Sequence, residues 1–406
     1  MNSKENDDVV SGQWLAKKRV INMNENRLKL KSLEIKGYKS IPSSGQRIDF
    51  GDITILLGAN GSGKSNLVSF FKLLNFLTSK GLQVFIGKQG GADALLYYGS
   101  KNTDKIEFSV CLKQSECNEH RSTQYDAKLV HGMPDRLFFA SEKVTFKRSD
   151  AVKPEEFFIE TGNGESGLPD DQRTRSKVLF SALSEIRAYQ FHDTSDTAKI
   201  KSNGYIDDSR YLRSDAGNLA AFLLGMLNNP DNRKYYDRIV RHIQKVMPQF
   251  KNFELETIPK HDLNTARDTY IKLNWYDNAN DTLFGPHQLS DGSLRFMALS
   301  ALLLQPASML PQVIIIDEPE LGLHPAAIAE LAGMIKTASK NAQIIIATQS
   351  TRLVDEFSAN EIVVVERSET NNSSIFKRLN ENELDDWLSR YSLSELWEKN
   401  VLGGRP

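Results

Sequence analysis

At 406 residues, with 40% apolar and 25% charged side chains, the chain has the composition of a globular protein that can bury the core of one large or two ordinary domains, which excludes a disordered tail. Its 51 Lys and Arg nearly cancel its 52 Asp and Glu, so no global electrostatic field draws it to nucleic acid or to an anionic membrane. Any DNA contact therefore has to come from a local patch.

The N-terminal stretch is one such patch, because residues 1–41 contain nine Lys or Arg against five acidic residues. We interpret residues 1–27 as a mobile, solvated segment, with a DNA contact as the alternative. The first residues lack the apolar run of a leader peptide, and no stretch reaches the roughly 18 apolar residues of a membrane span. We therefore expect a cytoplasmic protein with no membrane partner.

The cysteine residues indicate neither a disulfide framework nor a common zinc module. Only Cys111 and Cys117 occur, which excludes a disulfide framework. His120 and His131 lie near them in the sequence, but the C-x5-C-x2-H spacing fits no common zinc module. Surface or half-buried thiols are the expectation.

The first predicted elements are a strand, a second strand, a glycine-rich turn and a helix. Residues 28–41 alternate apolar and polar side chains, as in a half-exposed strand, and residues 52–57 form a short apolar strand. Residues 65–78 have helical periodicity. Four alternating runs over residues 106–160 predict an antiparallel meander, and the Gly, Pro and Asp content of residues 162–172 predicts a loop.

The rest of the chain alternates strands with helices. The expected strands are residues 184–191, 252–258, 269–276, 313–316, 343–348 and 361–366, and the expected helices are residues 216–227, 235–246, 293–304 and 325–339. Ser214 and Asp215 are the expected cap of the first of these helices. Apolar strands interleaved with helices predict an α/β fold with a parallel sheet covered on both faces. No heptad run occurs, which excludes a long coiled coil.

The turn between the second strand and the first helix carries a phosphate-loop motif. Residues 58–65, GANGSGKS, match G-x-x-x-x-G-K-S in the required strand-to-helix context. Glycines let successive backbone N–H groups point at phosphate oxygens, Lys64 would reach the β- and γ-phosphates, and Ser65 would bind Mg²⁺. The alternative is a plain glycine turn. The expected nucleotide-binding residues are Gly58, Asn60, Gly61, Ser62, Gly63, Lys64, Ser65 and Asn66.

A second anion-binding motif precedes the helix at residues 293–304. Residues 289–295 read LSDGSLR, an LS-x-G-x-x-R pattern in which Ser290, Gly292 and the first helix amides form the expected nucleotide contact. A plain helix cap with a turn glycine is the alternative. Asp317 follows Ser290 by 27 residues (317 minus 290), and this spacing favours the functional interpretation.

Two carboxylates lie at the end of a buried strand. Asp317 and Glu318 follow the apolar run VIII; Asp317 is a candidate Mg²⁺ ligand, and Glu318 is the candidate that polarises the attacking water. Burying adjacent carboxylates without a cation is costly, which argues against a purely structural role. Gln349, after the next apolar strand, is a candidate contact of the γ-phosphate or the water, with a polar strand end as the alternative.

These four motifs in this order resemble the ABC-type ATPase head of the RecF/SMC-like and OLD-like branch, over roughly residues 28–366. The resemblance implies a P-loop NTPase with a mixed or parallel sheet core, an antiparallel β insertion and a helical lobe. It also implies ATP with Mg²⁺, Lys39 near the nucleotide, and Gln190 as the Q-loop glutamine that joins Ser65 and Asp317 at the metal, with Gln89 as the competing match. Residues 320–324 would form the D-loop, which faces a neighbouring subunit.

The chain departs from the family pattern in three respects. Transporters have histidine at the position of Gln349, and no coiled coil separates the two halves. Only 89 residues follow Asp317 (406 minus 317), and the ATPase fold itself needs them. If a TOPRIM-type nuclease such as that of OLD proteins is involved, it must therefore be on another chain.

The resemblance implies a homodimer in which the LS-x-G-x-x-R segment of one copy completes the phosphate site of the other. We expect an ATP-hydrolysing switch in DNA repair or antiphage defence that controls a separately encoded effector. A nucleotide sensor with little turnover and a transporter ATPase subunit are the alternatives.

We expect the chain to be organised in six segments. These are a mobile N-terminal segment (residues 1–27), the first part of the ATPase lobe with the phosphate loop (28–105), an antiparallel β region (106–200), a helical lobe with strands (201–285), the segment with the later motifs (286–366) and a helical tail (367–406).

The tail carries a further signal. Ser392 and Glu395 have the spacing of a capping box. The apolar side chains here are Trp387, Leu393, Leu396 and Trp397. We interpret them as packing onto the chain's own lobe, with docking of a partner protein as the alternative.

Overall fold

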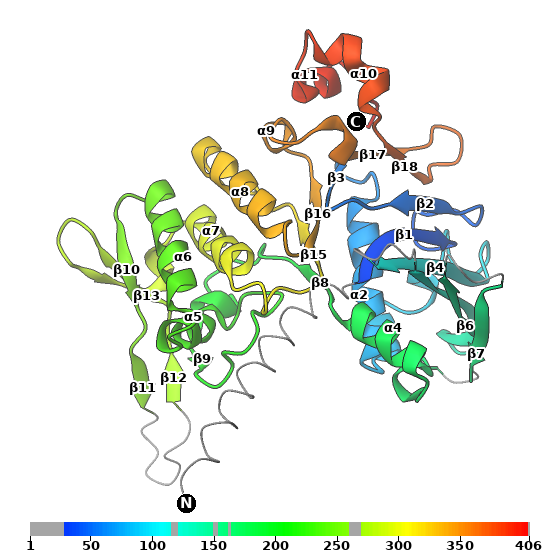
Figure 1. The fold of residues 1–406 in the computed structure, drawn as a ribbon, viewed down its shortest axis with the longest axis horizontal. Coiled ribbons are helices and arrows are strands. Elements are labelled where there is room, and N and C mark those ends of the chain that lie inside the picture. The colour runs from blue at the N-terminus through cyan, green and yellow to red at the C-terminus, as the bar shows by residue number, and fades with distance from the viewer. Residues whose placement is uncertain (1–27, 115–120, 149–152, 161–163, 260–268, 405–406) are drawn as a thin grey trace, which may run out of the picture. The chain divides into compact units, whose positions relative to one another are not determined.

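A computed structural model of the protein describes residues 28–114, 121–148, 153–160, 164–259 and 269–404 (Figure 1). Within these ranges the chain divides into two compact units. The first unit contains residues 28–50 and 76–184, and the second contains residues 51–75 and 185–404. The expected segment 28–105 therefore contributes to both units, whereas the expected segment 1–27, with most of the basic N-terminal patch, lies outside the described residues.

The first unit is built on a six-stranded antiparallel sheet with strand order β2-β1-β4-β5-β6-β7. Its burial alternates residue by residue along β4 and β5, which is why the period-2 pattern was readable from the sequence. The predicted meander over residues 106–160 is confirmed, and β1 and β2 extend it. The strands are β1 (Leu28–Lys36), β2 (Gln46–Asp49), β4 (Lys105–Gln114), β5 (Arg121–Gly132), β6 (Arg136–Arg148) and β7 (Glu155–Ile159).

Two helices of the first unit, α3 (Leu82–Lys88) and α4 (Thr174–Ser184), contact β6. Neither was predicted, because α3 is short and α4 follows the predicted loop directly with little apolar periodicity. That loop contains a 3₁₀ turn, Leu168–Asp170, and its residues 162–163 lie outside the described ranges.

A buried carboxylate on β6 joins this sheet to the segment before α4. Glu142 has 0% exposure and accepts hydrogen bonds from the Tyr125 hydroxyl, from Ser166 Oγ at 2.5 Å and from the Gly167 amide at 2.8 Å. Burial, together with the negative charge of Glu142, raises the pKa of Tyr125 well above its usual range. The network is satisfied internally, so its role is structural.

Replacing Glu142→Ala is expected to lower the free energy of unfolding by about 3 kcal/mol, because two buried hydroxyl donors and one partly buried amide lose their acceptor. Urea titration of the full chain measures this change. Glu156→Ala is the matched control, since Glu156 lies on the neighbouring strand and its ion pair with Lys143 is half exposed. The control is expected to change stability by less than about 1 kcal/mol. Equal losses in the two variants would contradict a structural role for the buried network.

The second unit contains the predicted α/β core. Its six-stranded sheet has the order β18-β17-β3-β16-β15-β8; all neighbours are parallel except β18, which runs antiparallel to β17. These strands are β3 (Ile53–Leu57), β8 (Ile186–Tyr189), β15 (Val313–Asp317), β16 (Gln343–Thr348), β17 (Ile362–Arg367) and β18 (Ser374–Arg378). Every residue of β3, β15 and β16 is buried, as their continuous apolar runs predicted.

Helices cover both faces of this sheet, which confirms the predicted layering. α2 (Lys64–Thr78) lies on one side, and α7 (Asp291–Leu304) and α8 (Pro325–Ala338) lie on the other (Figure 1). Alternate residues of the sheet, including Ile314 and Ile344, share a buried core with α7 and α8. The core sheet with its two helical layers is therefore an α/β P-loop architecture.

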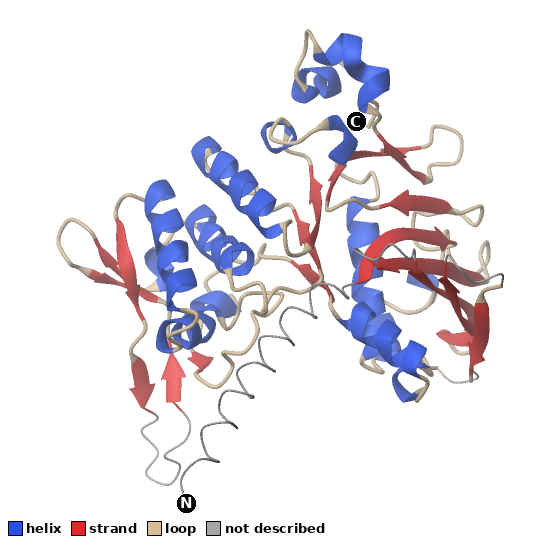
Figure 2. Ribbon diagram, viewed as in Figure 1, coloured by secondary structure: helices blue, strands red, loops and turns tan. Residues whose placement is uncertain are grey.

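A helical region with two small sheets completes the second unit (Figure 2). Phe250, Trp275 and Phe284 stack in succession there, with ring centroids 6.1 and 4.9 Å apart. The helices are α5 (Leu219–Asn228) and α6 (Arg233–Val246), and the sheets have the orders β10-β13-β14 and β11-β12-β9. Their strands are β9 (Gly204–Tyr205), β10 (Phe250–Glu254), β11 (Thr257–Pro259), β12 (Thr269–Ile271), β13 (Asn274–Asp277) and β14 (Leu283–Phe284).

The predicted cap of α5 is wrong. The helix begins at Leu219 rather than at Ala216, because Ala216 has a φ of +54° that a right-handed helix cannot contain. Asp215 does not cap the helix; its Oδ1 accepts a hydrogen bond from the Gly217 amide at 3.0 Å and forms a local turn.

The C-terminal tail packs onto its own lobe. Within it lie α10 (Glu381–Leu388) and α11 (Leu393–Glu398), and the strand β18 before them was not predicted. The capping box of Ser392 and Glu395 is confirmed. Leu393 and Leu396 of α11 are buried, whereas Trp387 is 45% exposed. Packing onto the lobe is therefore the correct interpretation for α11.

Candidate functional site

The predicted site residues follow the carboxyl ends of four neighbouring strands of the second unit. The register pairs Leu57 with Thr348 and Asp317 with Ala347, and Tyr189 of β8 pairs with Ile316. The phosphate loop, Gln190, Glu318 and Gln349 thus emerge at one edge of the sheet. Ligands of open α/β sheets bind at this edge.

The phosphate loop has the backbone that its glycines permit. Gly61 and Gly63 have φ angles of +80° and +117°, a region that other residues rarely adopt. A Cβ on Gly58 would meet the Val365 carbonyl oxygen at 2.2 Å, so only glycine fits there. Asn60 and Ser65 are exposed.

Three contacts that sequence reasoning missed brace the loop from the outside. Arg367 Nε donates to the Gly61 carbonyl at 2.7 Å, Ser374 Oγ donates to the Ser62 carbonyl at 2.6 Å, and the Ala59 amide donates to the Gly404 carbonyl at 3.1 Å. These partners lie 306, 312 and 345 positions (404 minus 59) away in the sequence, and no local motif marks them. The first two contacts engage carbonyls of the loop, whereas the third uses the Ala59 amide.

Two buried polar groups in the loop fit a polyanion. Lys64 is 4% exposed, and its Nζ donates to the carbonyls of Gly58 at 2.5 Å and Ala59 at 2.9 Å. Burial lowers the pKa of Lys64, and the charges of nearby acidic residues oppose that shift. The Ser62 hydroxyl is buried with no hydrogen-bond partner among the described residues. A phosphate oxygen would satisfy both groups.

Asp317 is held by residues from two other elements. It is 4% exposed; its Oδ2 accepts from Gln190 Nε2 at 2.7 Å, and its carbonyl oxygen lies 2.9 Å from His192 Nε2. Gln190 Oε1 in turn accepts from Lys72 Nζ, a lysine of α2 that sequence reasoning missed. Burial lowers the pKa of Lys72, and Asp317 opposes that shift. Helical spacing from Lys64 to Lys72 was the available signal for this residue.

The two Q-loop candidates have different surroundings. Gln190 contacts Asp317, whereas Gln89 belongs to the first unit and accepts a hydrogen bond from Lys39 Nζ at 2.9 Å. Lys39 belongs to that same unit and has a φ of +48°. The structure thus brings Gln190 together with a predicted metal ligand.

The residues after Asp317 form a connected turn. Glu318 has a φ of +43°, and its amide donates to the Ala347 carbonyl at 2.7 Å, which fixes its backbone against the adjacent strand. Glu320 turns inward: its Oε1 accepts from Thr348 Oγ1 at 2.5 Å and from the Gln349 amide at 3.3 Å. Burial raises the pKa of Glu320, and its Oε2 has no partner among the described residues. The expectation was that residues 320–324 face another subunit. The Glu320 side chain does not fit it, because it points into its own chain, whereas the neighbouring Leu321 is 40% exposed.

The LS-x-G-x-x-R segment is linked to that same turn. Ser290 Oγ accepts a hydrogen bond from the Ser293 amide at 3.2 Å and caps α7, which is the contact expected if the motif is a plain helix cap. A Cβ on Gly292 would meet the Gly322 carbonyl oxygen at 2.1 Å, so the helix start packs directly on the turn. Arg295 Nη1 donates to the Leu321 carbonyl at 3.0 Å.

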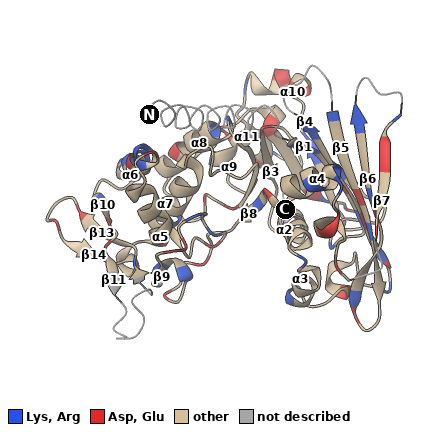
Figure 3. Ribbon diagram, turned by 60° about the horizontal axis from the view of Figure 1, so that its bottom comes forward, with Lys and Arg blue, Asp and Glu red and all other residues tan. Residues whose placement is uncertain are grey.

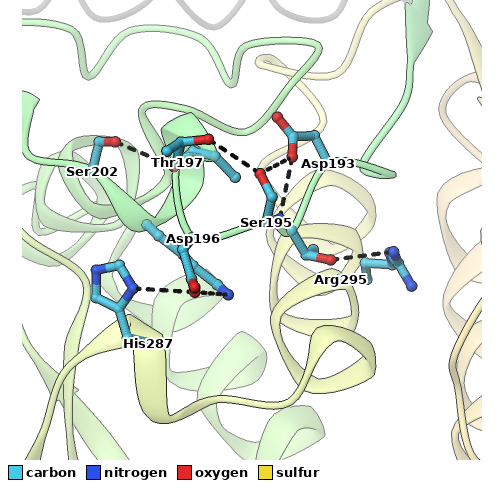
Figure 4. A network of polar contacts seen from close by, with 10 residues as sticks. Asp193, Ser195, Asp196, Thr197, Ser202, His287 and Arg295 are labelled. Atoms are coloured by element: carbon cyan, nitrogen blue, oxygen red, sulfur yellow. Dashed lines mark hydrogen bonds and ion pairs between the residues drawn. The ribbon is translucent and has the colours of Figure 1, made fainter.

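Arg295 also connects this segment to the residues after β8. Its Nε donates to the Phe191 carbonyl at 3.0 Å, and its Nη2 donates to the His192 carbonyl at 2.9 Å. Figure 4 shows the polar stretch that follows, in which Ser195 Oγ donates to Asp193 Oδ1 at 2.7 Å. One guanidinium therefore ties together the segment after Gln190, the start of α7 and the turn after Glu318.

The donor set suits Mg²⁺. Ser65, Asp317 and Gln190 offer hydroxyl, carboxylate and amide oxygens, the hard ligands that Mg²⁺ takes together with phosphate oxygens. In the part of the chain that the structure describes, no three His, Cys, Asp or Glu residues gather to form a metal site by themselves. Cys117 and His120 of the loose cysteine group lie outside the described ranges, and His131 Nε2 lies 3.3 Å from Asp135 Oδ1.

A phosphate loop after β3, a polar residue after the adjacent strand β16 and two carboxylates at the end of the next strand, β15, define a P-loop NTPase fold. Residues 53–355 match the family described as "AAA domain, putative AbiEii toxin, Type IV TA system", and the chain belongs to this family. The predicted ABC/SMC-like ATPase fold is confirmed.

Sequence and structural relatives agree with this assignment. The chain is 21% identical over 392 residues to the "Retron Vc95 probable ATPase" of Vibrio cholerae serotype O1 biovar El Tor, covering 84% of this chain and 74% of that protein. The Smc head of Pyrococcus furiosus, solved with an extended coiled coil and the C-terminal domain of ScpA, matches with a TM-score of 0.53 and 16% identity over 89% of this chain and 99% of that one. The Smc head of Pyrococcus yayanosii, with a coiled coil and joint, matches with a TM-score of 0.52 and 12% identity over the same shares. These structures share the fold.

Across the described ranges, no helix combines the length and apolar character that a membrane crossing requires.

Proposed function

We propose that the protein is a Mg²⁺-dependent ATPase that acts as a nucleotide-gated dimeric switch. The observation that carries this proposal is the convergence of a buried lysine, a paired carboxylate and a polar switch residue at one edge of the core sheet. Lys64 lies in the phosphate loop, Asp317 ends β15 and Glu318 follows it, and Gln349 follows β16. This arrangement provides charge for the phosphates and a base for water.

Each side chain has a distinct role in the proposed reaction. The loop amides, with Asn60 and Asn66, hold the β- and γ-phosphates, and Lys64 exchanges its backbone carbonyl contacts for phosphate oxygens. Ser65, Asp317 and Gln190 would hold Mg²⁺, which supplies positive charge at the phosphate oxygens. Glu318 accepts a proton from the attacking water, and Gln349 orients that water. Glu320 positions the Thr348–Gln349 peptide through its two hydrogen bonds.

The proposed site is completed by a second copy of the chain. Ser290 and Gly292 lie at the N-terminus of α7, where the first amides of a helix have no acceptor within the helix. In the proposed dimer this terminus contacts the γ-phosphate bound to the other copy. ATP joins the copies and hydrolysis releases them.

Antiphage defence is the proposed setting, with DNA repair as the alternative. The AbiEii description of the family and the similarity to a retron ATPase support it. The switch would control an effector, such as a nuclease, encoded separately. DNA is a further candidate partner, because α6 places Lys234, Arg238, Arg241 and Lys245 at helical spacing on one face, where Figure 3 shows basic residues gathered.

A nucleotide sensor with little turnover is the second candidate, and Gln349 in place of the transporter histidine favours it. Steady-state phosphate release, measured with and without duplex DNA, separates the two. Turnover supports the switch, whereas tight ATP binding without turnover in either condition supports the sensor.

Complementation tests the shared pocket. Ser290→Arg and Lys64→Ala proteins are each expected to be inactive, because each lacks one half of every pocket. Mixed in equal amounts and allowed to exchange, they are expected to recover about one quarter of native phosphate release, since half of the dimers then contain one complete pocket. Mixing Lys64→Ala with Glu318→Gln is the control, because both changes affect the same half and no pocket is rebuilt. Absence of recovery in the first mixture, with exchange verified, would refute the shared pocket.

A further inference from the structure

A lysine outside every nucleotide motif lies beside the proposed metal ligands. Lys72 is on α2, eight positions (about two turns) after Lys64. Its Nζ donates to Gln190 Oε1, and Gln190 Nε2 donates to Asp317 Oδ2 at 2.7 Å. Ammonium, amide and carboxylate thus form one chain that connects α2, the end of β8 and the end of β15.

The orientation of the Gln190 amide follows from its two neighbours. A primary amide has one carbonyl oxygen, which accepts, and one NH₂ group, which donates. The oxygen faces the Lys72 ammonium and the NH₂ faces the Asp317 carboxylate. Turning the amide over would place the NH₂ against the ammonium and the oxygen against the carboxylate, and both contacts would be repulsive.

This orientation is incompatible with metal binding by both residues. A cation held by Asp317 Oδ2 and Gln190 Oε1 needs the amide oxygen to turn toward Asp317, away from Lys72. The NH₂ group would then face Lys72, and the ammonium would also repel the incoming cation. Lys72 must therefore release Gln190 before Gln190 and Asp317 can share a metal ion.

We propose that Lys72 is a positioning residue that occupies the amide oxygen of Gln190 in the resting site and competes with the divalent cation for it. The proposal rests on the proposed function, because it assumes that nucleotide and Mg²⁺ bind at this edge of the sheet. Lys72 raises the cation concentration that the site requires, and Gln190 joins the metal only after the ammonium has moved away.

The test replaces Lys72→Met in the full chain, which removes the charge and retains most of the aliphatic stem. Binding of Mn²⁺ in the presence of ADP, followed by electron paramagnetic resonance with Mg²⁺ as competitor, is expected to tighten about threefold to tenfold when the like charge is removed. Lys72→Arg retains the charge and is expected to keep the native affinity. Lys80→Met is the matched control, because Lys80 lies just after the same helix and its ammonium pairs with Asp170 at the surface.

The possible outcomes separate this inference from the proposed function. Weaker Mn²⁺ binding by Lys72→Met would mean that Lys72 helps to position the metal ligands, and unchanged binding would mean that it has no effect on them. Either result would contradict the proposal that Lys72 competes with the cation. Should Lys72→Met fail to fold, Lys72→Gln provides the same neutral change with a polar end. An Asp317→Ala protein that binds Mn²⁺ as the native protein does would contradict the metal site itself, and hence the proposed function.

Discussion

A Lys64→Ala protein is expected to lose ATP binding by at least about 100-fold while keeping its fold. Lys64 supplies a buried ammonium next to Gly58 and Ala59, and charge-assisted contacts of this kind to phosphate oxygens are the strong ones in an anion site. The methyl group of alanine cannot replace them. Calorimetric titration with ATP measures the loss directly.

Thermal unfolding provides the control for folding in this experiment. Without ATP the Lys64→Ala protein is expected to unfold near the native temperature, and addition of ATP should raise the transition of the native protein only. Lys340→Ala removes an exposed lysine after α8 and is expected to retain the response to ATP. If Lys64→Ala bound ATP as the native protein does, the assignment of the phosphate loop would be refuted.

The core sheet and the phosphate loop were predictable because short stretches determine them. Short, largely apolar runs such as ITILL and VIII are typical of strands buried on both faces, and each lies in an entirely buried strand of the second unit. The phosphate loop requires glycine at Gly61 and Gly63 for local backbone reasons, so its geometry could be read from eight residues.

The contacts that hold the site residues in place could not be predicted from the sequence, because they depend on which distant segments become neighbours in the fold. Arg367 and Ser374 contact the phosphate loop from β17 and β18. The choice between Gln190 and Gln89 likewise depends on topology: β8 pairs with β15, and this pairing places Gln190 next to Asp317. A sequence motif contains no information about the order of strands in a sheet.

Local signals also failed where side-chain hydrogen bonds compete with the helix. Asp215 was a reasonable helix cap by residue type, but it bonds to the amide of Gly217 two positions on, a turn that short acidic side chains also favour. Glu320 shows the same limit at the site. Its position in the motif suggested an exposed carboxylate, yet Thr348 and Gln349 provide donors that hold it inward.

Those inward contacts give the site an internal connection that the motifs alone do not imply. Glu320 joins the turn after Glu318 to Gln349, and Arg295 joins that same turn to the start of α7. A displacement of the turn would therefore move both Gln349 and the LS-x-G-x-x-R segment. In the proposed dimer, this linkage provides a physical route from hydrolysis to release of the second copy.

Glu318→Gln is expected to retain ATP binding and to lower phosphate release by about 10²- to 10³-fold, the contribution typical of a general base. Glutamine matches the shape of glutamate but cannot accept the proton of the attacking water. The backbone is expected to stay in place, because the hydrogen bond from the Glu318 amide to Ala347 does not involve the side chain. With hydrolysis blocked, the ATP-bound dimer should accumulate, and light scattering after size exclusion would detect it with ATP but not with ADP.

Glu369→Gln, at an exposed turn between β17 and β18, is the control and is expected to behave as the native protein does. Native turnover by Glu318→Gln would show that another group activates the water, and a monomer in saturating ATP would show that the nucleotide does not join two copies.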